Sequence, residues 1–316
     1  MIRDIPKFKD ILDAHERIIP LIHRTPVFTS RAINNLFDND FYFKCENFQK
    51  VGAFKFRGAC NAVFSLSPGE VKKGVATHSS GNHAAALALA AKARATTARI
   101  VMPENAPEVK KKAVKGYGGR ITWCEPTLKA REETLDKIVK ESGAVFIHPY
   151  DDPRIIAGQG TATKELMDDI EDLDFLLTPV GGGGLFSGTL ISGKASSQKI
   201  NIIGVEPAGA DDAYRSLISG NLHPSINPNT IADGLLTSLS PLTFRIISDL
   251  ADDIITVSEK AIVHAMKLIW ERMKIIVEPS SAVPLAAFID NKLKIKNNKI
   301  GIILSGGNVE LDNLPF

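Results

Sequence analysis

The feature that most constrains the fold of this chain is a repeating order of elements. A short run of apolar, often β-branched residues is followed by a turn rich in glycine, serine or proline, and then by a helical pattern. Parallel strands need long crossover connections, usually helices, so this alternation predicts an α/β protein with mostly parallel sheets covered by helices on both faces. Strands are expected at residues 41–46, 75–79, 99–103, 120–124, 145–149, 175–180, 202–206, 254–257 and 300–304. Helices are expected at residues 82–95, 107–117, 129–142, 154–169, 185–195, 258–273 and 280–291.

One part of this pattern stands apart as a candidate domain. Residues 74–149 carry an unbroken series of expected strands and helices, and we predict that they form a small domain. It would be inserted in a larger domain made of residues 1–73 and 150–316. The loop 221–230, rich in proline and asparagine, is expected to cross the surface. Ligands in open α/β sheets bind outside the carboxyl ends of the strands, and the motifs below follow expected strands.

Composition excludes several classes of function. The apolar fraction of 44% and the charged fraction of 23% are typical of globular proteins and exclude disorder. A net charge of +2 offers no electrostatic basis for binding nucleic acid or an anionic membrane. Cys45, Cys60 and Cys124 show neither metal-binding spacing nor a disulfide framework, which favours a reducing compartment. Without a signal-peptide pattern at the start or an apolar run long enough to span a bilayer, a soluble, cytoplasmic protein is expected.

The first chemical motif is Lys50-Val-Gly-Ala-Phe-Lys-Phe-Arg-Gly58, in which Lys55 lies between two phenylalanines. Burial among aromatic rings disfavours an ammonium ion, so the pKa of such a lysine falls and its amine becomes a nucleophile that can form an imine. Taken alone, the nonapeptide favours a simpler interpretation, an amphipathic helix start whose lysine reaches water.

The second motif is a polar turn, Thr77-His-Ser-Ser-Gly-Asn-His83, between an expected strand and an alanine-rich helix. Free amides at a helix start, together with hydroxyl groups, form a good binding site for a carboxylate. Simple helix capping is the alternative, but a cap needs one polar residue and this turn offers Ser79, Ser80 and Asn82. His83 fits a structural role and a ligand contact equally well.

The third motif is a run of four glycines, Gly181, Gly182, Gly183 and Gly184, directly after an expected strand. Consecutive glycine amides at a helix start can approach and bind a phosphate, whereas a tight turn alone needs only one or two glycines. A nicotinamide dehydrogenase is the rival interpretation, with Glu206 at a suitable distance for a ribose contact. The spacing G-x-G-x-x-G fails, however, because Ser187 occupies the third glycine position.

Two further features have ordinary explanations when taken singly. Ser305 ends the expected strand 300–304 before a glycine turn, where its hydroxyl could meet a ring nitrogen. The loop from Glu206 to Asp212 combines carboxylates with a free carbonyl, a set that suits a hard divalent cation. A solvated acidic loop is the commoner outcome for such a spacing.

In this order, the motifs resemble those of the fold-type II pyridoxal-phosphate enzymes, specifically the serine racemase and serine/threonine dehydratase family. The resemblance runs from about Ile11 to the end of the chain. It implies two open, mostly parallel twisted sheets, a small domain that moves when substrate binds, and a homodimer. It also implies pyridoxal 5'-phosphate as the cofactor, bound by Phe54, Lys55, Asn82, Gly181, Gly182, Gly183, Gly184, Leu185 and Ser305.

The resemblance assigns roles to these residues. Lys55 would form the Schiff base, Phe54 would lie against the cofactor ring, and Asn82 would bond the phenolic oxygen of the ring. The glycine amides and that of Leu185 would hold the phosphate, and Ser305 would face the pyridine nitrogen. The substrate-binding residues that it implies are Ser79, Ser80, Asn82, His83 and Arg131. A divalent cation (Mg²⁺, Ca²⁺ or Mn²⁺) would be held by Glu206, the carbonyl of Ala210 and Asp212, and ATP would be an effector.

The expected activity is racemisation of serine together with dehydration of L-serine, D-serine and threonine. Lys55 would move a proton at Cα on one face and Ser80 on the other, and the uncharged hydroxyl of Ser305 would favour elimination. The Ser-Ser-Gly-Asn-His sequence is that of serine racemases, whereas threonine dehydratases commonly have Ser-Ala-Gly-Asn-His. Ala84 and Tyr150 depart from the glycine and asparagine of animal racemases. The alternative is a threonine or 3-hydroxyaspartate dehydratase without significant racemisation.

Overall fold

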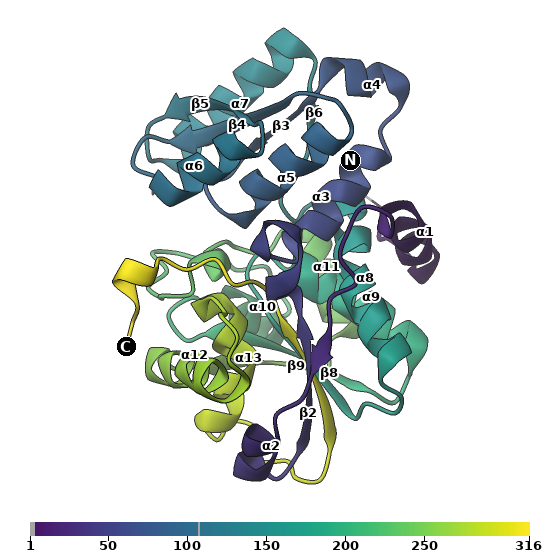
Figure 1. Ribbon diagram of the computed structural model, residues 1–316, viewed down its shortest axis with the longest axis vertical. Helices are drawn as coiled ribbons and strands as arrows, with labels where there is room; N and C mark the ends of the chain where they lie inside the picture. The colour runs from purple at the N-terminus through teal and green to yellow at the C-terminus, as the bar shows by residue number, and fades with distance from the viewer. Residues whose placement is uncertain (1–3, 107) are drawn as a thin grey trace.

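The protein contains two sheets, each made mainly of parallel strands (Figure 1). This computed structural model describes residues 4–106 and 108–316. The larger sheet has the order β1-β2-β10-β7-β8-β9, and only the short β1 is antiparallel to its neighbour. The smaller sheet, β5-β4-β3-β6, is parallel throughout. The predicted α/β class with two mostly parallel sheets is therefore confirmed.

The strands agree closely with the expected runs. In the larger sheet they are β1 (Val27–Phe28), β2 (Asp40–Cys45), β7 (Phe175–Pro179), β8 (Asn201–Pro207), β9 (Asp253–Val257) and β10 (Lys299–Leu304). In the smaller sheet they are β3 (Val75–His78), β4 (Ala98–Pro103), β5 (Arg120–Cys124) and β6 (Val145–Phe146). Only β6 is clearly shorter than expected. The run predicted to 149 ends at Phe146, although the next amide, that of Ile147, still donates to the Ala76 carbonyl of β3.

The expected helices all form, with small changes at their ends. They are α5 (Asn82–Ala93), α6 (Glu108–Gly116), α7 (Leu128–Ser142), α8 (Pro153–Asp169), α9 (Gly184–Ser196), α12 (Glu259–Met273) and α13 (Pro279–Ile289). The expected start of one helix at Pro107 lies outside the described residues. Further helices were not assigned bounds from the sequence: α1 (Phe8–Ile18), α2 (Arg31–Phe37), α3 (Lys55–Phe64), α4 (Pro68–Lys73), α10 (Asp212–Ser219) and α11 (Pro241–Leu250). Single-turn 3₁₀ helices are η1 (Glu46–Phe48), η2 (Lys50–Gly52), η3 (Asp233–Leu235) and η4 (Leu311–Asn313).

Helices cover both faces of the larger sheet, as the near-continuous apolar strands require. Ile302 packs in one buried cluster with residues of α12 and α13, whereas the adjacent Ile303 packs in another with Leu166 of α8 and Leu190 of α9. Successive residues of a strand point to opposite faces, so β10 contributes to two cores. No helix in the described part of the chain is long and apolar enough to cross a lipid bilayer.

Helix α3 lies between the two sheets (Figure 1). Its residues Phe56 and Val63 share a buried cluster with Leu87 and Ile100 of the smaller sheet's layer. On another side, Gly58 lies so close to α8 that a Cβ there would come within 2.9 Å of the Ile155 carbonyl. The helix that begins at Lys55 is therefore packed against both parts of the molecule.

Candidate active site

Lys55 is the first residue of α3, and its side chain enters a region between the two sheets. Its Nζ donates a hydrogen bond to the Pro149 carbonyl at 3.1 Å and lies 5.0 Å from the centroid of the Phe54 ring. Desolvation lowers the pKa of Lys55 to about 8, although the nearby Glu278 carboxylate acts in the opposite direction. About a tenth of this amine is therefore uncharged at pH 7, far more than for an ordinary lysine, and this uncharged form can act as a nucleophile or base.

The backbone before Lys55 is fixed to the end of β10. The amide of Phe54 donates to the Ser305 carbonyl at 3.0 Å, and Ala53 forms a β-bridge with Gly306. Ser305 is buried, and its hydroxyl lies 3.1 Å from that of Ser281. A neutral hydroxyl group therefore occupies the strand end beside the lysine-bearing turn.

The serine turn (residues 79–82) joins β3 to α5. The N-cap of α5 is Gly81, so no side chain caps this helix, and the Ser79 hydroxyl accepts a hydrogen bond from the Gly81 amide. The capping interpretation is therefore wrong, because the amides of the first turn lack a side-chain acceptor. An uncapped helix start beside half-buried hydroxyls at Ser79 and Ser80 is suited to a carboxylate.

Asn82 belongs to a polar network that the sequence did not reveal. Its Nδ2 donates to both carboxyl oxygens of Glu278 at 3.1 Å, and its Oδ1 accepts from Asn308 Nδ2 at 2.9 Å. The Asn308 amide also donates to Glu278. Burial, and then the charge of Asp233, raises the pKa of Glu278 to about 7. A sequence signal does exist, since Glu278 is a single acidic residue in the apolar stretch Ile-Ile-Val-Glu-Pro.

His83 and Arg131 lie on the smaller sheet's side of the site. His83 Nε2 lies 3.2 Å from the Ile147 carbonyl, so this nitrogen carries the proton. Burial, and then the charge of Lys55, lowers the pKa of His83 to about 3, which leaves the ring neutral. Arg131 extends from α7, where its charge influences His78 at the end of β3. Arg131 Nε is buried and has no hydrogen-bond partner among the described residues.

The glycine turn (residues 181–184) connects β7 to α9 and is buried. Gly183 has φ +82°, a conformation that side-chain-bearing residues rarely adopt, and it is the N-cap of α9 without any side-chain cap. A Cβ at Gly182 would come within 2.4 Å of the Tyr150 ring, and a Cβ at Gly181 would reach within 2.9 Å of Leu235. The four glycines therefore allow close approach as well as an unusual turn.

Tyr150 connects the lysine with the glycine turn, because it follows Pro149, whose carbonyl accepts from Lys55. The Tyr150 ring packs edge-on against His148 at 4.6 Å, and its hydroxyl forms a hydrogen bond with Thr237. Burial raises the pKa of Tyr150 to about 12, so it stays protonated. Lysine, serine turn, glycine turn and strand end thus belong to one region at the carboxyl ends of the strands.

The acidic loop forms a separate buried cluster. Glu206 accepts hydrogen bonds from the amides of Ala213 and Tyr214, and Asp212 Oδ2 accepts from the Leu239 amide at 3.1 Å. Burial raises the pKa of Asp212 to about 6 and, together with Asp212, raises that of Glu206 well above its usual value. Both side chains are fully buried, so the solvated-loop interpretation is wrong.

A bound cation would compensate the negative charge of these two buried carboxyl groups. Asp212 Oδ1 is buried and has no hydrogen-bond partner among the residues described. Among the described residues, no three acidic, histidine or cysteine side chains come together. The carbonyl of Ala210 and water would therefore have to complete the coordination shell of a cation.

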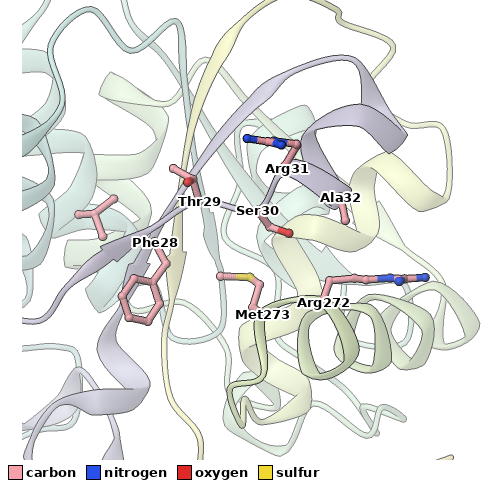
Figure 2. Close-up of a pocket in the computed structure, with 8 residues that line it drawn as sticks. Phe28, Thr29, Ser30, Arg31, Ala32, Arg272 and Met273 are labelled. Carbon is pink, nitrogen blue, oxygen red and sulfur yellow. The ribbon is translucent and has the colours of Figure 1, made fainter.

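A pocket lies away from these residues, at β1, α2 and the end of α12 (Figure 2). This open pocket has a volume of about 510 Å³ and includes none of the predicted site residues. Two guanidinium groups, those of Arg31 and Arg272, line it together with Phe28 and Met273.

Comparison with known proteins decides the family. Residues 18–306 match the family model described as pyridoxal-phosphate dependent enzyme. The chain belongs to this family. It is 53% identical to serine racemase of Dictyostelium discoideum over 310 residues, covering 97% of this chain and 96% of that protein. It is 50% identical to β-hydroxyaspartate dehydratase of Paracoccus denitrificans, covering 99% of both chains. The solved structure of maize serine racemase superposes with a TM-score of 0.96 at 46% identity, covering 98% and 95% of the two chains.

The residues of the site fit pyridoxal phosphate. An amine with a lowered pKa can link covalently to its aldehyde, and the uncapped start of α9 at the glycine turn suits its phosphate. The hydroxyl of Ser305 is a partner for an uncharged ring nitrogen. The family match also removes the nicotinamide dehydrogenase alternative, which gave no role to Lys55.

Proposed function

We propose that this protein is a serine racemase that also dehydrates L-serine, D-serine and threonine, giving D-serine from L-serine and pyruvate with ammonia from serine. The observation that carries the proposal is the Lys55 amine, whose pKa is lowered to about 8 beside the Phe54 ring. Support also comes from the similarity to proteins named serine racemase at about half of all positions. Bound pyridoxal phosphate would supply an electron sink for the bonds to Cα.

In this proposal Lys55 moves the proton on one face of Cα. Its amine is held by the Pro149 carbonyl, which restricts the directions in which Nζ can point. A pKa near neutrality balances the uncharged amine, which accepts a proton, against the ammonium, which returns it.

Binding of the substrate carboxylate is assigned to the serine turn. The uncapped start of α5 offers amide donors, Ser79 and Asn82 add polar groups, and Arg131 brings a guanidinium with an unused buried N–H. His83 supports the turn as a neutral ring. We assign to Ser80 the proton on the second face of Cα, since its half-buried hydroxyl lies in the turn between β3 and α5 and so comes from a different element than Lys55.

Elimination competes with racemisation in this site. The hydroxyl of Ser305 cannot stabilise a positive ring nitrogen as a carboxylate would, so negative charge at Cα is stored poorly. Loss of the β-hydroxyl is then favoured, and substantial dehydratase activity is expected.

Replacement of Lys55 by alanine tests the proposal. Wild-type protein purified with pyridoxal phosphate is expected to show the visible absorption of covalently bound cofactor, and Lys55→Ala is expected to lose it together with activity on serine. The neighbouring Lys50→Ala is the control. Visible absorption that persists in Lys55→Ala would contradict the proposal.

A second candidate is a threonine or 3-hydroxyaspartate dehydratase without significant racemisation. It is favoured by the 50% identity to β-hydroxyaspartate dehydratase and by Tyr150, which narrows the space beside the glycine turn. Incubation with L-serine, L-threonine and 3-hydroxyaspartate separates the two, if both the D-enantiomer and the 2-oxo acid are quantified. A 2-oxo acid without D-serine supports the second candidate.

We also assign a divalent cation, Mg²⁺ or alternatively Ca²⁺ or Mn²⁺, to Glu206, the Ala210 carbonyl and Asp212. Its support is the unpartnered Oδ1 of Asp212 and the mutual repulsion of two buried carboxylates. The site is linked to the glycine turn through Leu239, whose amide bonds Asp212 and whose side chain lies against Gly183.

ATP is assigned as an effector on the resemblance to the family alone. A homodimer is proposed across the surface beside the pocket of Figure 2. Phe28 and Phe48 pack edge-to-face there and are 38% and 43% exposed, and aromatic residues are enriched in protein interfaces. Three cysteines without disulfides support a reducing, cytoplasmic location.

We further propose that residues 74–149 form a small domain that moves on substrate binding. Its helix α6 reaches across to η3, where Lys110 and Asp233 form an ion pair at 2.6 Å. Such a contact between separate layers would form and break as the domain moves.

A further inference from the structure

Four fully buried charged side chains form a cluster directly behind the turn that carries Lys55. They are Lys44 of β2, Glu46 of η1, Arg57 of α3 and Glu165 of α8, each with 0% exposure. The two cations balance the two anions, so the cluster is neutral as a whole. Its members come from four different elements of the fold.

Arg57 is the centre of this charge cluster. Its Nε and Nη2 donate to the two oxygens of Glu46 at 2.7 and 2.8 Å. On the other side, Nη1 and Nη2 donate to the two oxygens of Glu165 at 2.9 and 2.8 Å. Lys44 completes the cluster with a 2.7 Å bond to Glu165. A planar guanidinium held by two carboxylates in forked pairs has a fixed position and orientation.

The position of Arg57 in its helix connects the cluster with Lys55. Two residues along an α-helix turn the side-chain direction by about 200°, so Arg57 and Lys55 leave the first turn of α3 on opposite sides. Arg57 points into the cluster while Lys55 points to Pro149. The next residue, Gly58, donates its amide to Gln159 of α8 at 3.1 Å. The start of α3 is thus fixed against α8 by polar contacts with directional geometry.

Stability alone does not explain such a cluster. Burying charges is costly, and apolar residues of similar volume often give an equal or more stable core. Arg57 and Lys44 hold the pKa of Glu165 down to about 2, although burial raises it, so the carboxylate remains charged. Forked contacts between charged groups have a preferred geometry, which apolar contacts lack. They therefore fix the orientation of the first turn of α3, and this orientation determines where the Lys55 amine lies.

We propose that Arg57 is a positioning residue for Lys55: its forked contacts to Glu46 and Glu165 orient the first turn of α3 so that the lysine amine meets the cofactor aldehyde and the substrate. The inference rests on the proposed role of Lys55 as the reacting amine. It assigns to the cluster a function in catalysis that its members perform without touching substrate.

The test compares Arg57→Lys with Lys44→Met as a matched control. Both substitutions disturb the cluster, but only Arg57 belongs to the helix that carries Lys55. In the full chain freed of cofactor, the pH dependence of Lys55 acetylation is measured by peptide mass spectrometry, with the exposed Lys112 as internal reference. In the full chain with cofactor, the rate of pyridoxal phosphate binding and the kcat and KM for serine are measured, along with Tm.

Arg57→Lys is expected to shift the acetylation midpoint of Lys55 toward that of Lys112 and to slow cofactor binding and lower kcat by about tenfold or more, since small misplacements of a reacting group are costly. KM should change by less than about twofold. Lys44→Met is expected to lower Tm at least as much but to leave Lys55 acetylation unchanged. Equal changes in both variants, or an unchanged acetylation profile in Arg57→Lys, would overturn the inference.

If Arg57→Lys does not fold, Glu46→Gln provides the second variant, since it keeps the shape of the side chain but weakens one fork. It is expected to change Lys55 acetylation in the same direction, and an unchanged profile counts against the inference. The acetylation measurement needs no cofactor. If wild-type protein does not bind pyridoxal phosphate, the proposed function is refuted. The acetylation profiles would still show whether Arg57 positions Lys55.

Discussion

At the scale of single residues, the carboxyl group of Glu278 links parts of the site that are distant in sequence. It accepts a hydrogen bond from the side-chain amide of Asn82 at the start of α5. It accepts another from the backbone amide of Asn308 after β10. It also acts electrostatically on Lys55. Its protonation state therefore influences both the proposed substrate-binding turn and the reacting amine.

The raised pKa of Glu278 predicts a specific pH dependence of stability. In the folded protein the group stays protonated up to about pH 7, whereas in the unfolded chain it ionises near its usual value of 4.5. Between these values the folded state binds more protons, so this group lowers the free energy of unfolding as pH rises, by up to about 3 kcal/mol. Glu278→Gln, which cannot ionise, should gain stability relative to wild type between pH 5 and 8.

Denaturant unfolding at several pH values measures this effect. A stability difference between Glu278→Gln and wild type that is independent of pH would show that the carboxyl is not protonated in the folded protein.

Ser80 carries the second residue-scale prediction. If its hydroxyl moves the proton on the second face of Cα, Ser80→Ala should reduce formation of D-serine from L-serine by about 100-fold or more, and formation of pyruvate much less. Chiral chromatography and a 2-oxo acid assay on the same samples measure the two products. Ser79→Ala is the matched control in the same turn. Equal losses of both products in Ser80→Ala would refute the two-face mechanism.

Single site residues could be predicted from the sequence where the chemistry depends on neighbouring residues in the chain. Lys55 between phenylalanines and the four glycines are visible as short motifs, because each depends on its immediate neighbours. Glu278 could not be found in this way, since its partners Asn82 and Asn308 are far from it along the chain. The Pro149 carbonyl was likewise expected inside a strand, where a backbone acceptor would bond another strand instead of Lys55.

At the scale of elements, the segment from η3 to α11 connects the proposed cation site with the glycine turn. Leu239 in this segment donates to Asp212, and its side chain would come within 2.8 Å of a Cβ at Gly183. Burial, and then the charge of Asp212, raises the pKa of Glu206 well above its usual value, and a bound cation would favour the ionised form. A cation at the start of α10 would therefore act through Leu239 on the glycine turn, which is proposed to hold the cofactor phosphate.

This arrangement predicts a cation-dependent stability. Mg²⁺ at 100 times its dissociation constant should add about 2.7 kcal/mol to the free energy of unfolding of the wild type, and EDTA should remove it. Asp212→Ala should show the same Tm with Mg²⁺ and with EDTA. Asp211→Ala is the control, because that half-buried side chain pairs with Arg215 instead. Calorimetric scans with each additive give the result, and a Mg²⁺ response retained in Asp212→Ala would place the cation elsewhere.

The regular elements were predictable to the extent that their apolar pattern was long. The nine expected strands and seven expected helices form. Those of the larger sheet, such as β7 and β10, are buried along nearly their whole length. Strand β1 was not predicted, because a strand of two residues is too short to show an alternating pattern. Helix α11 had an available signal, since Ser240 caps the Thr243 amide and Pro241 occupies the first turn, but the apolar pattern beside it is short.

At the scale of the whole molecule, the ion pair of Lys110 and Asp233 connects the smaller sheet's layer with the segment over the glycine turn. Both side chains are partly exposed, so the pair is worth at most about 1 kcal/mol, or about fivefold in an equilibrium. If residues 74–149 close over the substrate, Lys110→Ala should raise KM by up to about fivefold and leave kcat nearly unchanged.

Lys112→Ala, an exposed change on the same helix, is the control for this prediction. Steady-state kinetics at low and high salt should show that salt mimics Lys110→Ala in the wild type but has little further effect on the variant. An unchanged KM in Lys110→Ala at low salt would remove this pair from the closing motion.

The location of α3 between the two layers has a mechanical consequence. If residues 74–149 rotate against the rest of the chain, atoms near the rotation axis travel least, and α3, which packs against both parts, would lie close to that axis. The amine at residue 55 would then stay almost still while the hydroxyls of the serine turn sweep inward. Substrate would be delivered to a stationary base, and the enzyme could open and shut on every turnover without disturbing the atom that reacts.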